Sequence, residues 1–502
     1  MTGYDYDVAV VGVGAVGGVL ANLLGAQGLR TVAIDRSAEG VQLPRGVGLD
    51  GEIMRVAQTV GLAGTLEALM QPFPGAQYLD AEGNLVSTRP ARRSTGSQGW
   101  PDRYQFHQPD FEQVFRSGMT AYPSLDLRLG WEADEVTAGP DGGATVTATQ
   151  AETGERATLT ARYVVGCDGA RALVRRAAGI TYDDLGLNQP WIVVDLEIGD
   201  DVDLPAVNTH YADPERPVIY INVVRNVRRY EFRAGPDEDL EGALEPDAIW
   251  ERVSRWVRPD QATLVRAAVY THRSLVARAW RQGPLLVAGD AAHQTPPFMG
   301  QGLCAGVRDA SALAWRLGAI INDGAAGTLL DSYEAERSHH ARVIIEAATA
   351  LGQVYTKPDK TKLETINASI GREGQGQTPR LGPGLWTGGG PGGTLAPQPR
   401  LADGRLLDDP VGYRFAVTAT ADTLAALGEA TRDLAAAAGF AVIEATGDTA
   451  AWLEELEAGA VITRPDRYYY GTFGGAADLD EAVRELVAAV APDRMTATHA
   501  QR

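Results

Sequence analysis

The hydrophobic positions near the N-terminus predict a strand, a helix and a second strand. An apolar run over 6–11 (YDVAVV) has the length of a buried strand. Apolar residues at helical spacing follow over 16–27, and a glycine marks where this helix stops. The next apolar run, 29–34 (LRTVAI), leads directly to Asp35 and Arg36. We therefore predict that a βαβ unit opens the chain, with an acidic residue at its far end.

The rest of the chain divides into stretches of different pattern. Residues 74–109 are irregular, and a helix is expected over 110–121 with Asp110 as its N-cap. Strand-like runs separated by turns, typical of an antiparallel sheet, lie between 182 and 269. Long helical patterns follow a buried strand at 285–288.

A Gly- and Pro-rich segment separates the last part of the chain, in which strands and helices alternate again. These patterns predict an α/β fold. The expected parts are a discontinuous first domain over 1–181 and 270–370, a second domain over 182–269 to which about 74–109 contributes, a linker over 371–400 and a C-terminal domain over 401–502.

Composition and charge exclude several classes of partner. The chain carries 45 basic and 65 acidic side chains, and its net charge of −20 repels phosphate backbones and anionic lipid headgroups. Cys167 and Cys304 lie far apart and form no CxxC motif, as is usual in a reducing cytoplasm. No apolar run approaches the ~20 residues of a membrane-spanning helix. We expect a cytoplasmic protein that binds neither nucleic acid nor membranes, and a homodimer is left open.

Metal binding is not expected either. His339 and His340 are neighbours on a predicted helix, so their side chains point in different directions and make a poor metal pair.

The first βα turn contains the spacing of a dinucleotide-binding loop. Gly12, Gly14 and Gly17 permit a tight turn, close approach of the backbone to a pyrophosphate, and close helix–strand packing. Asp35 is placed to accept a hydrogen bond from a ribose hydroxyl. The motif alone cannot separate FAD from NAD, and a glycine-rich turn without a ligand is the alternative. Ala15 and Val16 within the turn, and Arg36 after the second strand, are further candidates for contact with the dinucleotide.

A second loop favours FAD. The buried strand 285–288 leads to Asp290, which can bind a polyol hydroxyl, and a long helix begins near residue 302. The start of that helix can direct N–H groups at an anion such as a reduced flavin ring. The residues concerned are Gly300, Gly302, Leu303 and Cys304. Pro297 stiffens the loop and leaves its carbonyl free. His293 is a candidate base, with fixation of the loop by hydrogen bonds as the alternative.

The residues themselves indicate a family. The run GDAAHQTPPFMGQGLCAGVRDA (289–310) closely resembles the "GD" motif of group A flavoprotein aromatic hydroxylases, and YVVGCDGAR (163–171) resembles their "DG" motif. Arg45 in PRGVGLDGEIMR, Gln108 in FHQPDFEQVF, and the run DSYEAER match further family positions. Within the family, GWP (99–101), NQPWIVVD (188–195) and VYTH (269–272) resemble the 3-(3-hydroxyphenyl)propionate hydroxylase branch most, and AVITRPD (460–466) resembles the thioredoxin-like tail of larger members.

The resemblance implies a fold for each part of the chain. The first domain becomes a Rossmann-like FAD-binding domain of the hydroxybenzoate-hydroxylase type, the second an α+β substrate-binding domain, and the last a thioredoxin-like domain. Without a CxxC motif that last domain is not expected to do redox work. Family positions also add Arg45, Gln108 and Asp168 to the FAD contacts, and they assign Arg45, Pro297 and His293 to the catalytic site.

The implied activity is a monooxygenase reaction on a phenolic ring. NADH or NADPH reduces FAD, O2 adds to give a C4a-hydroperoxide, and one oxygen atom enters the ring ortho to an existing hydroxyl. The Pro297 carbonyl is the implied neighbour of that hydroxyl, and Arg45 follows the flavin between its positions. The alternatives are a flavin-dependent oxidase or reductase, an NAD-dependent dehydrogenase and a non-catalytic flavin-binding subunit.

Substrate contacts are predicted from aromatic character alone. The second-domain sheet is expected to cover the flavin, which makes Trp191, Tyr220, Tyr230 and Phe232 candidates. Four arginines on the same strands could bind a substrate carboxylate, or they could be solvated edge residues. They are Arg225, Arg228, Arg229 and Arg233.

Overall fold

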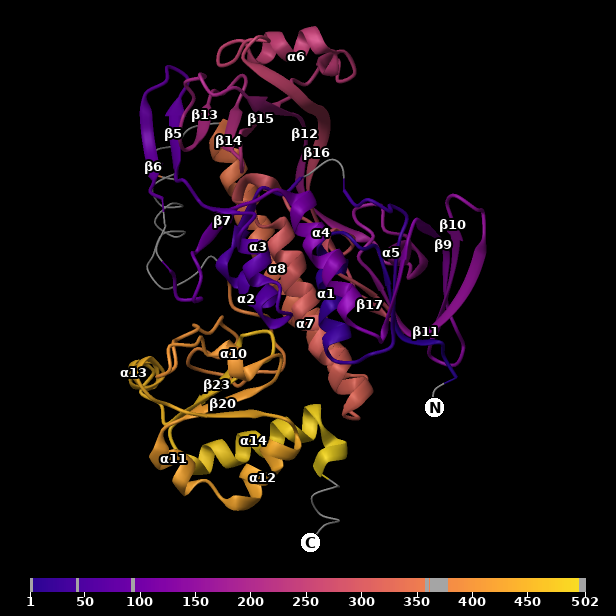
Figure 1. Ribbon diagram of the computed structural model, residues 1–502, viewed down its shortest axis with the longest axis vertical. Coiled ribbons are helices and arrows are strands. Elements are labelled where there is room, and N and C mark those ends of the chain that lie inside the picture. Colours follow the sequence, from indigo (N-terminus) through magenta and orange to yellow (C-terminus); the bar gives the residue numbers. More distant parts are fainter. Residues whose placement is uncertain (1–2, 42–44, 92–94, 357–360, 362–377, 496–502) are drawn as a thin grey trace.

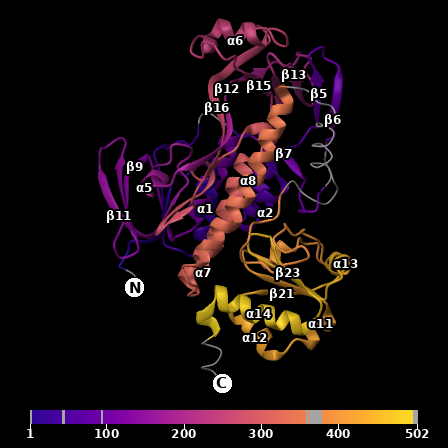
Figure 2. The same cartoon turned by 180° about the vertical axis from the view of Figure 1, so that it is seen from behind.

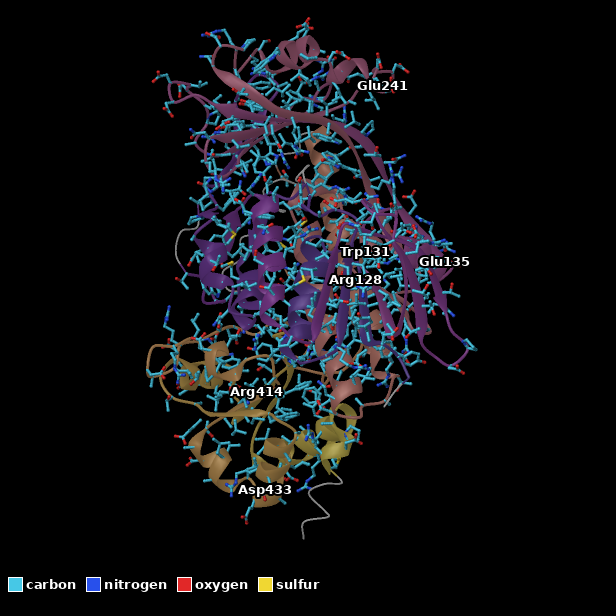
Figure 3. The ribbon with its side chains drawn as sticks, turned by 45° about the vertical axis from the view of Figure 1, so that its right-hand side comes forward. Arg128, Trp131, Glu135, Glu241, Arg414 and Asp433 are labelled. Atoms are coloured by element: carbon cyan, nitrogen blue, oxygen red, sulfur yellow. The ribbon has the colours of Figure 1, made fainter. Side chains whose placement is uncertain are left out.

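The computed structural model describes residues 3–41, 45–91, 95–356, 361 and 378–495. Three parts follow one another along the long axis of the molecule (Figure 1). A mostly antiparallel sheet capped by α6 (Pro246–Val253) lies at one end, the first βαβ unit lies in the middle, and the C-terminal domain lies at the other end. Glu241 near α6 and Asp433 of the C-terminal domain mark these opposite ends in Figure 3.

The first sheet has the parallel core that the sequence predicts. Its main path runs β17-β18-β11-β1-β2-β8, and β1 pairs in parallel with both β11 and β2. The pair β9–β10 extends from β11 in antiparallel sense. The strands are β1 (Tyr6–Val11), β2 (Thr31–Asp35), β8 (Leu125–Leu129), β9 (Trp131–Ala138), β10 (Ala144–Gln150), β11 (Arg156–Gly166), β17 (Arg281–Gln282) and β18 (Leu285–Val287).

Helices from distant parts of the chain cover this sheet. The first helix, α1, packs beside α7, and the Gln27 side chain donates a hydrogen bond to the Ala314 carbonyl of α7 at 3.1 Å. The long helices α7 and α8 run side by side through the centre of the molecule (Figure 2). The helices are α1 (Ala15–Ala26), α2 (Gly51–Thr59), α3 (Ala63–Glu67), α4 (Gln108–Gly118), α5 (Leu173–Ala177), α7 (Gly302–Asn322) and α8 (Leu329–Thr356). A small sheet of β3 (Gly48–Asp50), β7 (Arg103–Gln105) and β4 (Gln71–Pro72) lies among them.

The predicted start of α4 is wrong by two residues. Asp110 is not the N-cap, because the helix begins at Gln108 with His107 in the capping position. Pro109 stands in the first turn, where a missing backbone N–H costs nothing. The shift places Gln108, a predicted cofactor contact, at the very start of the helix.

The second sheet joins segments from three regions of the sequence. Its order is β19-β16-β12-β15-β14-β13-β5-β6. The stretch that we expected to be irregular, 74–109, supplies β5 and β6 to this sheet, and β5 pairs in parallel with β13. The strands are β5 (Ala76–Asp80), β6 (Leu85–Arg89), β12 (Tyr182–Ile198), β13 (Asn208–Ala212), β14 (Val218–Asn222), β15 (Val227–Arg233), β16 (Ala262–Ala277) and β19 (His293–Gln294).

The C-terminal domain is a four-stranded sheet with the order β21-β20-β22-β23. The first pair, β20 and β21, is parallel, and the other two pairs are antiparallel. This order is compatible with the thioredoxin-like assignment, which stays a prediction. The elements are α10 (Asp408–Val411), β20 (Ala416–Ala419), α11 (Ala421–Ala426), α12 (Glu429–Ala437), β21 (Ala441–Glu444), α13 (Asp448–Glu455), β22 (Ala460–Thr463), β23 (Tyr469–Phe473) and α14 (Ala476–Val490).

The Gly- and Pro-rich segment packs against its neighbours. Its described part, 378–400, contains no helix or strand, yet Leu381 and Ala396 are buried. The backbone N–H of Gly382 donates to the Glu336 carbonyl of α8. The described part of the predicted linker therefore has no regular secondary structure, although some of its side chains are buried against neighbouring elements. Residues 371–377 lie outside the described part of the chain.

Buried ion pairs attach the C-terminal domain to the central helices. Arg464 contacts Glu336 of α8 at 2.7 Å, and Glu336 also receives Arg316 of α7 at 2.6 Å. On the other side Arg55 of α2 pairs with Asp408 at 2.7 Å. All five side chains are at most 5% exposed. Leaving one such charge without its partner in a dry interface is costly, so the domain is held in a fixed position.

Candidate cofactor and active site

Two of the three loop glycines are required by crowding. Gly12 has a φ of +95°, and a Cβ there would lie 2.6 Å from the Cys167 carbonyl oxygen. A Cβ on Gly17 would lie 1.8 Å from the Gly12 carbonyl oxygen. At Gly14 the nearest atom to a Cβ is a Glu112 carboxylate oxygen at 3.7 Å, so this part of the backbone is open. The loop therefore has a packed side and an accessible side, as a pyrophosphate cradle needs.

Asp35 lies beside this loop at the end of β2. One carboxylate oxygen accepts a hydrogen bond from the Val13 backbone N–H at 2.6 Å, and the other accepts from Ser37 N–H at 2.7 Å. The neighbouring Arg36 is exposed. The Asp35 carboxylate is thus held beside the glycine loop, where it can accept a hydrogen bond from the ribose of a bound dinucleotide.

The second loop lies against the first, as the sequence analysis requires. A Cβ on Gly289 would lie 2.9 Å from Val16 Cγ2, and one on Gly306 would lie 2.5 Å from the same methyl group. Asp290 is therefore next to the turn formed by 12–17, although the two are far apart in sequence. One extended ligand can contact both loops.

Arg45 connects three segments around this place. Its Nη1 forms an ion pair with Asp290 at 2.9 Å, and its backbone N–H donates to Gln108 Oε1 at 2.8 Å. Its carbonyl accepts a hydrogen bond from Arg229 Nη1 at 2.8 Å. The Arg45 side chain is 60% exposed and lies 5.8 Å from the centre of the Tyr270 ring. Its backbone is thus held from two sides while the guanidinium stays accessible.

Asp168 has a local structural role. Its Oδ2 accepts hydrogen bonds from the N–H groups of Leu173 and Val174, at 2.5 and 3.1 Å, and so fixes the turn that leads into α5. Burial raises its pKa, and backbone N–H donors oppose this. The turn around Asp168 contacts Gly12 directly, which brings the "DG" segment to the nucleotide loop.

The prediction of His293 as a catalytic base is wrong. The ring is fully buried, stacks on Trp280 at 5.5 Å, and shares a hydrogen bond of 2.8 Å with Asp309. Asp309 also accepts from the Gly289 N–H at 3.0 Å and from Arg337 at 3.0 Å. His293 therefore fixes the second loop, which is the alternative that the sequence analysis left open.

The start of α7 meets the proline-containing loop. Pro297 begins a short 3₁₀ turn (η4, Pro297–Met299), and its carbonyl accepts the Gly300 N–H at 2.7 Å. Gly300 has a φ of +62°. Within the described residues, α7 has neither a side-chain N-cap nor an acidic residue in its first turn. Its first N–H groups, from Gly302 onwards, are thus available as donors to an anion.

The side chains of Leu303 and Cys304 lie in different surroundings at the start of α7. A Cβ added to Gly46 would lie 3.4 Å from Leu303 Cδ1, so Leu303 borders the Arg45 segment. The Cys304 thiol is buried 4.0 Å from the Gly48 carbonyl, and burial raises its pKa to about 12. Any contact of Cys304 with a cofactor is therefore made by its backbone.

Three of the four predicted substrate contacts are wrong. Side chains alternate between the two faces of a strand, and Tyr220, Tyr230 and Phe232 fall on the outer face of the second sheet. There Tyr230 and Phe232 pack against Trp256, Tyr220 packs against Tyr230, and all three are at most 1% exposed. Trp191 lies on the inner face, 5.6 Å from the Phe298 ring of the proline-containing loop.

Besides Trp191 and its apolar neighbours, the inner face carries charged residues beside the Arg45 segment. A cavity of about 140 Å³ lies between this face and the Arg45 segment. Asp195, Arg229 and Arg266 contribute to its wall, together with Gly46, Val47, Phe106, His107, Gln108, Val223, Val227 and Val265. Arg229 and Arg266 both pair with Asp195 at 2.7 Å.

Three residues that organise the site were missed. Arg116 of α4 donates to the carbonyls of Val13, Ser37 and Ala38 and lies 3.4 Å from Asp35. Glu112 accepts from Gln108 and from the Val41 N–H, and Asp309 orders the second loop as described above. Arg116 and Glu112 stand one turn apart on the predicted helix after Gln108, which is the signal that could have indicated a shared face.

These observations fit FAD. Three features lie side by side. The glycine turn 12–17 is packed on one side and open on the other, Asp35 is fixed at the end of β2, and the Asp290 carboxylate is accessible. Two long helices begin here, and for α1 as for α7 no side-chain cap is found among the described residues. The residues that would hold the group are Gly12, Gly14, Ala15, Val16, Gly17, Asp35, Arg36, Arg45, Gln108, Asp168, Asp290, Gly300, Gly302, Leu303 and Cys304.

Comparisons with known proteins agree with this geometry. The FAD binding domain family matches residues 5–348. The chain belongs to the FAD-dependent aromatic hydroxylases. It is 34% identical to the "Probable NADH-specific resorcinol 4-hydroxylase" of Rhodococcus jostii, over 97% of this chain and 95% of that protein. It is 36% identical to the "3-(3-hydroxy-phenyl)propionate/3-hydroxycinnamic acid hydroxylase" of Mycobacterium avium, over 83% and 76% of the two chains.

The fold is found in solved structures of this enzyme class. A ternary complex of aklavinone-11 hydroxylase with FAD and aklavinone superposes with a TM-score of 0.84 and 21% identity, covering 98% of this chain and all of that one. This likeness shows that the chain has the same overall fold as that protein. Along the described residues, no helix is long and apolar enough to cross a membrane.

Proposed function

We propose that this hydroxylase uses a nicotinamide as reductant and acts on a small phenol that carries no carboxylate. The observation that carries the FAD assignment is the contact between the two loops, because it brings Asp290 beside Gly12–Gly17. Bound FAD supplies hydride acceptance from NAD(P)H and the activation of O2 for transfer to a ring carbon. NADH is the first reductant to test, because the relative that matches nearly the whole chain is named NADH-specific.

The protein's own residues position the ring and keep the site dry. The Pro297 carbonyl already accepts the Gly300 N–H, but a carbonyl oxygen has a second lone pair. It can therefore accept the phenolic O–H and increase electron density at the ortho carbon. Trp191 packs on Phe298, the residue after Pro297, and we expect this apolar pair to limit the access of water to the loop.

The arginines of the second sheet argue against a carboxylate substrate. Arg225 pairs with Asp110 at 2.6 Å, and Arg229 pairs with Asp195 and the Arg45 carbonyl. Arg233 donates to the Pro214 carbonyl, and Arg228 donates to the Arg225 and Val227 carbonyls. A substrate carboxylate would have to displace one of these partners, whereas a neutral phenol such as resorcinol requires no such exchange.

The test is a panel of phenols with and without a carboxylate. Resorcinol and 3-(3-hydroxyphenyl)propionate are compared for stimulated NADH and NADPH oxidation, with the hydroxylated product measured in parallel under isotopically labelled O2. We expect faster coupled turnover with resorcinol and one labelled oxygen in the product. Product without label indicates an oxidase or a reductase instead, and tighter coupling with the carboxylate compound contradicts our choice of substrate.

A further inference from the structure

A buried polar chain runs from the C-terminal domain into the flavin-binding part of the molecule. Tyr468, which precedes β23, donates its hydroxyl hydrogen to Glu52 Oε1 at 3.2 Å. The other oxygen of Glu52 accepts from Arg308 Nε of α7 at 2.6 Å. The three side chains are 3%, 5% and 2% exposed. Burial and the nearby Glu52 raise the pKa of Tyr468, which therefore remains a donor.

Arg308 continues this chain to the start of α7. Its Nη1 donates to Gln301 Oε1 at 3.0 Å, and its Nη2 donates to Asp50 Oδ2 at 3.0 Å. The Gln301 side chain, which is fully buried, donates in turn to Asp50 at 2.7 Å. Gln301 is the N-cap position of α7. The chain thus ends at the residue that sets where the first N–H groups of α7 point.

A branch of the chain reaches the proline-containing loop. Asp50 lies 3.7 Å from Arg103, and Arg103 Nη2 donates to the Met299 carbonyl at 3.1 Å. A second link comes from the irregular segment before the C-terminal domain, because Thr378 Oγ1 accepts from Arg308 and donates to Glu52, each at 3.3 Å. The same buried network therefore holds both the loop and the helix start.

Networks of this kind respond to the loss of one member. In a dry interior a charge that loses a hydrogen-bond partner is not compensated by water, so neighbouring side chains reorient. The C-terminal domain contributes one neutral group to this network, the Tyr468 hydroxyl. Its removal changes the network without removing a charge. We propose that the C-terminal domain positions the flavin-ring end of the cofactor site, with Tyr468 acting through Glu52, Arg308 and Gln301. This inference rests on the placement of the flavin ring at the α7 start.

The test compares two tyrosines of the same interface. Tyr468→Phe removes the hydroxyl that donates to Glu52 at the start of this hydrogen-bond network. Tyr413→Phe removes a hydroxyl that donates to the Ser311 carbonyl, ten residues beyond Gln301 on α7 and outside this network. Each apoprotein is titrated with FAD, the visible spectrum of the bound flavin is recorded, and apoprotein melting is measured. We expect Tyr468→Phe to raise the FAD dissociation constant ~3- to 10-fold and to shift the flavin spectrum, with Tyr413→Phe unchanged in both.

A double-mutant cycle shows whether the effect travels through the α7 start. In a Gln301→Met background, Tyr468→Phe is expected to have a smaller effect on FAD affinity than in the wild type, because the link from Arg308 to the start of α7 is cut and only the branch through Asp50 and Arg103 remains. Thr378→Val serves as a second entry point and is expected to act in the same direction. Equal effects of the two tyrosine variants, or additive effects in the cycle, overturn the inference. Wild-type protein that binds no FAD instead refutes the cofactor assignment itself.

Discussion

The two faces of the second sheet are built from the same strands and have opposite chemistry. On the outer face, Tyr220, Tyr230 and Phe232 form an aromatic cluster with Trp256 under α6. On the inner face, the same strands present Asp195 and Arg229 to the cavity beside the Arg45 segment. The outer face is a conventional core, whereas the inner face holds paired charges that connect to the cofactor loop.

This difference shows that aromatic character does not identify a substrate pocket. The outer aromatics are among the most completely buried residues of the sheet, which is how a core is stabilised. Buried charges on the inner face are weak stabilisers at best, so their presence points to a positioning task. Substitutions on the two faces should therefore separate stability from catalysis.

The largest effect is expected for Arg229→Ala. The substitution removes a partner of Asp195 and the donor to the Arg45 carbonyl. We expect the free energy of unfolding to fall by about 4 kcal/mol and coupled hydroxylation to be lost. Urea unfolding and the ratio of product formed to NADH consumed test both parts. Retention of full coupling in a folded variant would show that the inner face does not act on the Arg45 segment.

Phe232→Ala tests the outer face. Deletion of a buried ring beside Tyr230 and Trp256 leaves a cavity, and we expect a loss of about 3 kcal/mol in the free energy of unfolding. The KM for the phenol should stay unchanged at a temperature where the variant is folded. A large rise in KM with intact stability contradicts the placement of this residue away from the substrate.

The inner face should also respond to acid. Burial lowers the pKa of His272 to about 3, and it lowers that of His210, aided by Arg89, to about 3 as well. Since the unfolded chain takes up these protons near pH 6.5, the stability present above that pH is lost as the pH falls toward 3. His272→Phe, compared with the wild type at pH 7 and pH 5, is expected to reduce this loss by about 2 kcal/mol. If the variant and the wild type lose the same free energy of unfolding between pH 7 and pH 5, the lowered pKa of His272 is refuted.

The smallest expected effects distinguish two outer tyrosines. The Tyr220 hydroxyl donates to the Pro205 carbonyl at 3.0 Å, so Tyr220→Phe should cost about 1 kcal/mol. The Tyr230 hydroxyl is buried, and among the described residues it has no hydrogen-bond partner. Tyr230→Phe should therefore leave the melting temperature unchanged or raise it. Calorimetry on both variants is sufficient, and a lower melting temperature for Tyr230→Phe would indicate an ordered water at that hydroxyl.

The sequence was sufficient for the cofactor loops. Gly12, Gly17 and Asp290 belong to local strand–turn–helix patterns, and the crowding at Gly17 comes from the Gly12 carbonyl within the same turn, whereas that at Gly12 comes from the distant Cys167. The Arg45 and Gln108 positions came from family resemblance, and the structure adds that they bond to each other.

The sequence was not sufficient for the second sheet and the interfaces. Strand periodicity separates two faces but does not say which one meets the cofactor, and this is why Tyr220 and Phe232 were misplaced. Arg464 and Glu336 look like ordinary solvated charges, because their pairing depends on contacts between distant segments. Arg116 was missed for the same reason, since its partners are carbonyls far away in sequence.

The longest pair of strands limits how this enzyme can open. β12 and β16 are paired over most of their lengths, with register shifts after Asp184 and after Asp195, and β16 also pairs with β19 in the loop that follows Asp290. A ladder of this length resists bending away from its two irregular positions, so the second sheet cannot swing as a lid without breaking many hydrogen bonds at once. Entry and release of small molecules must therefore depend on loops and side chains. A chimera that exchanges the second sheet with that of a relative should therefore transfer β12 and β16 together, so that their pairing register is kept.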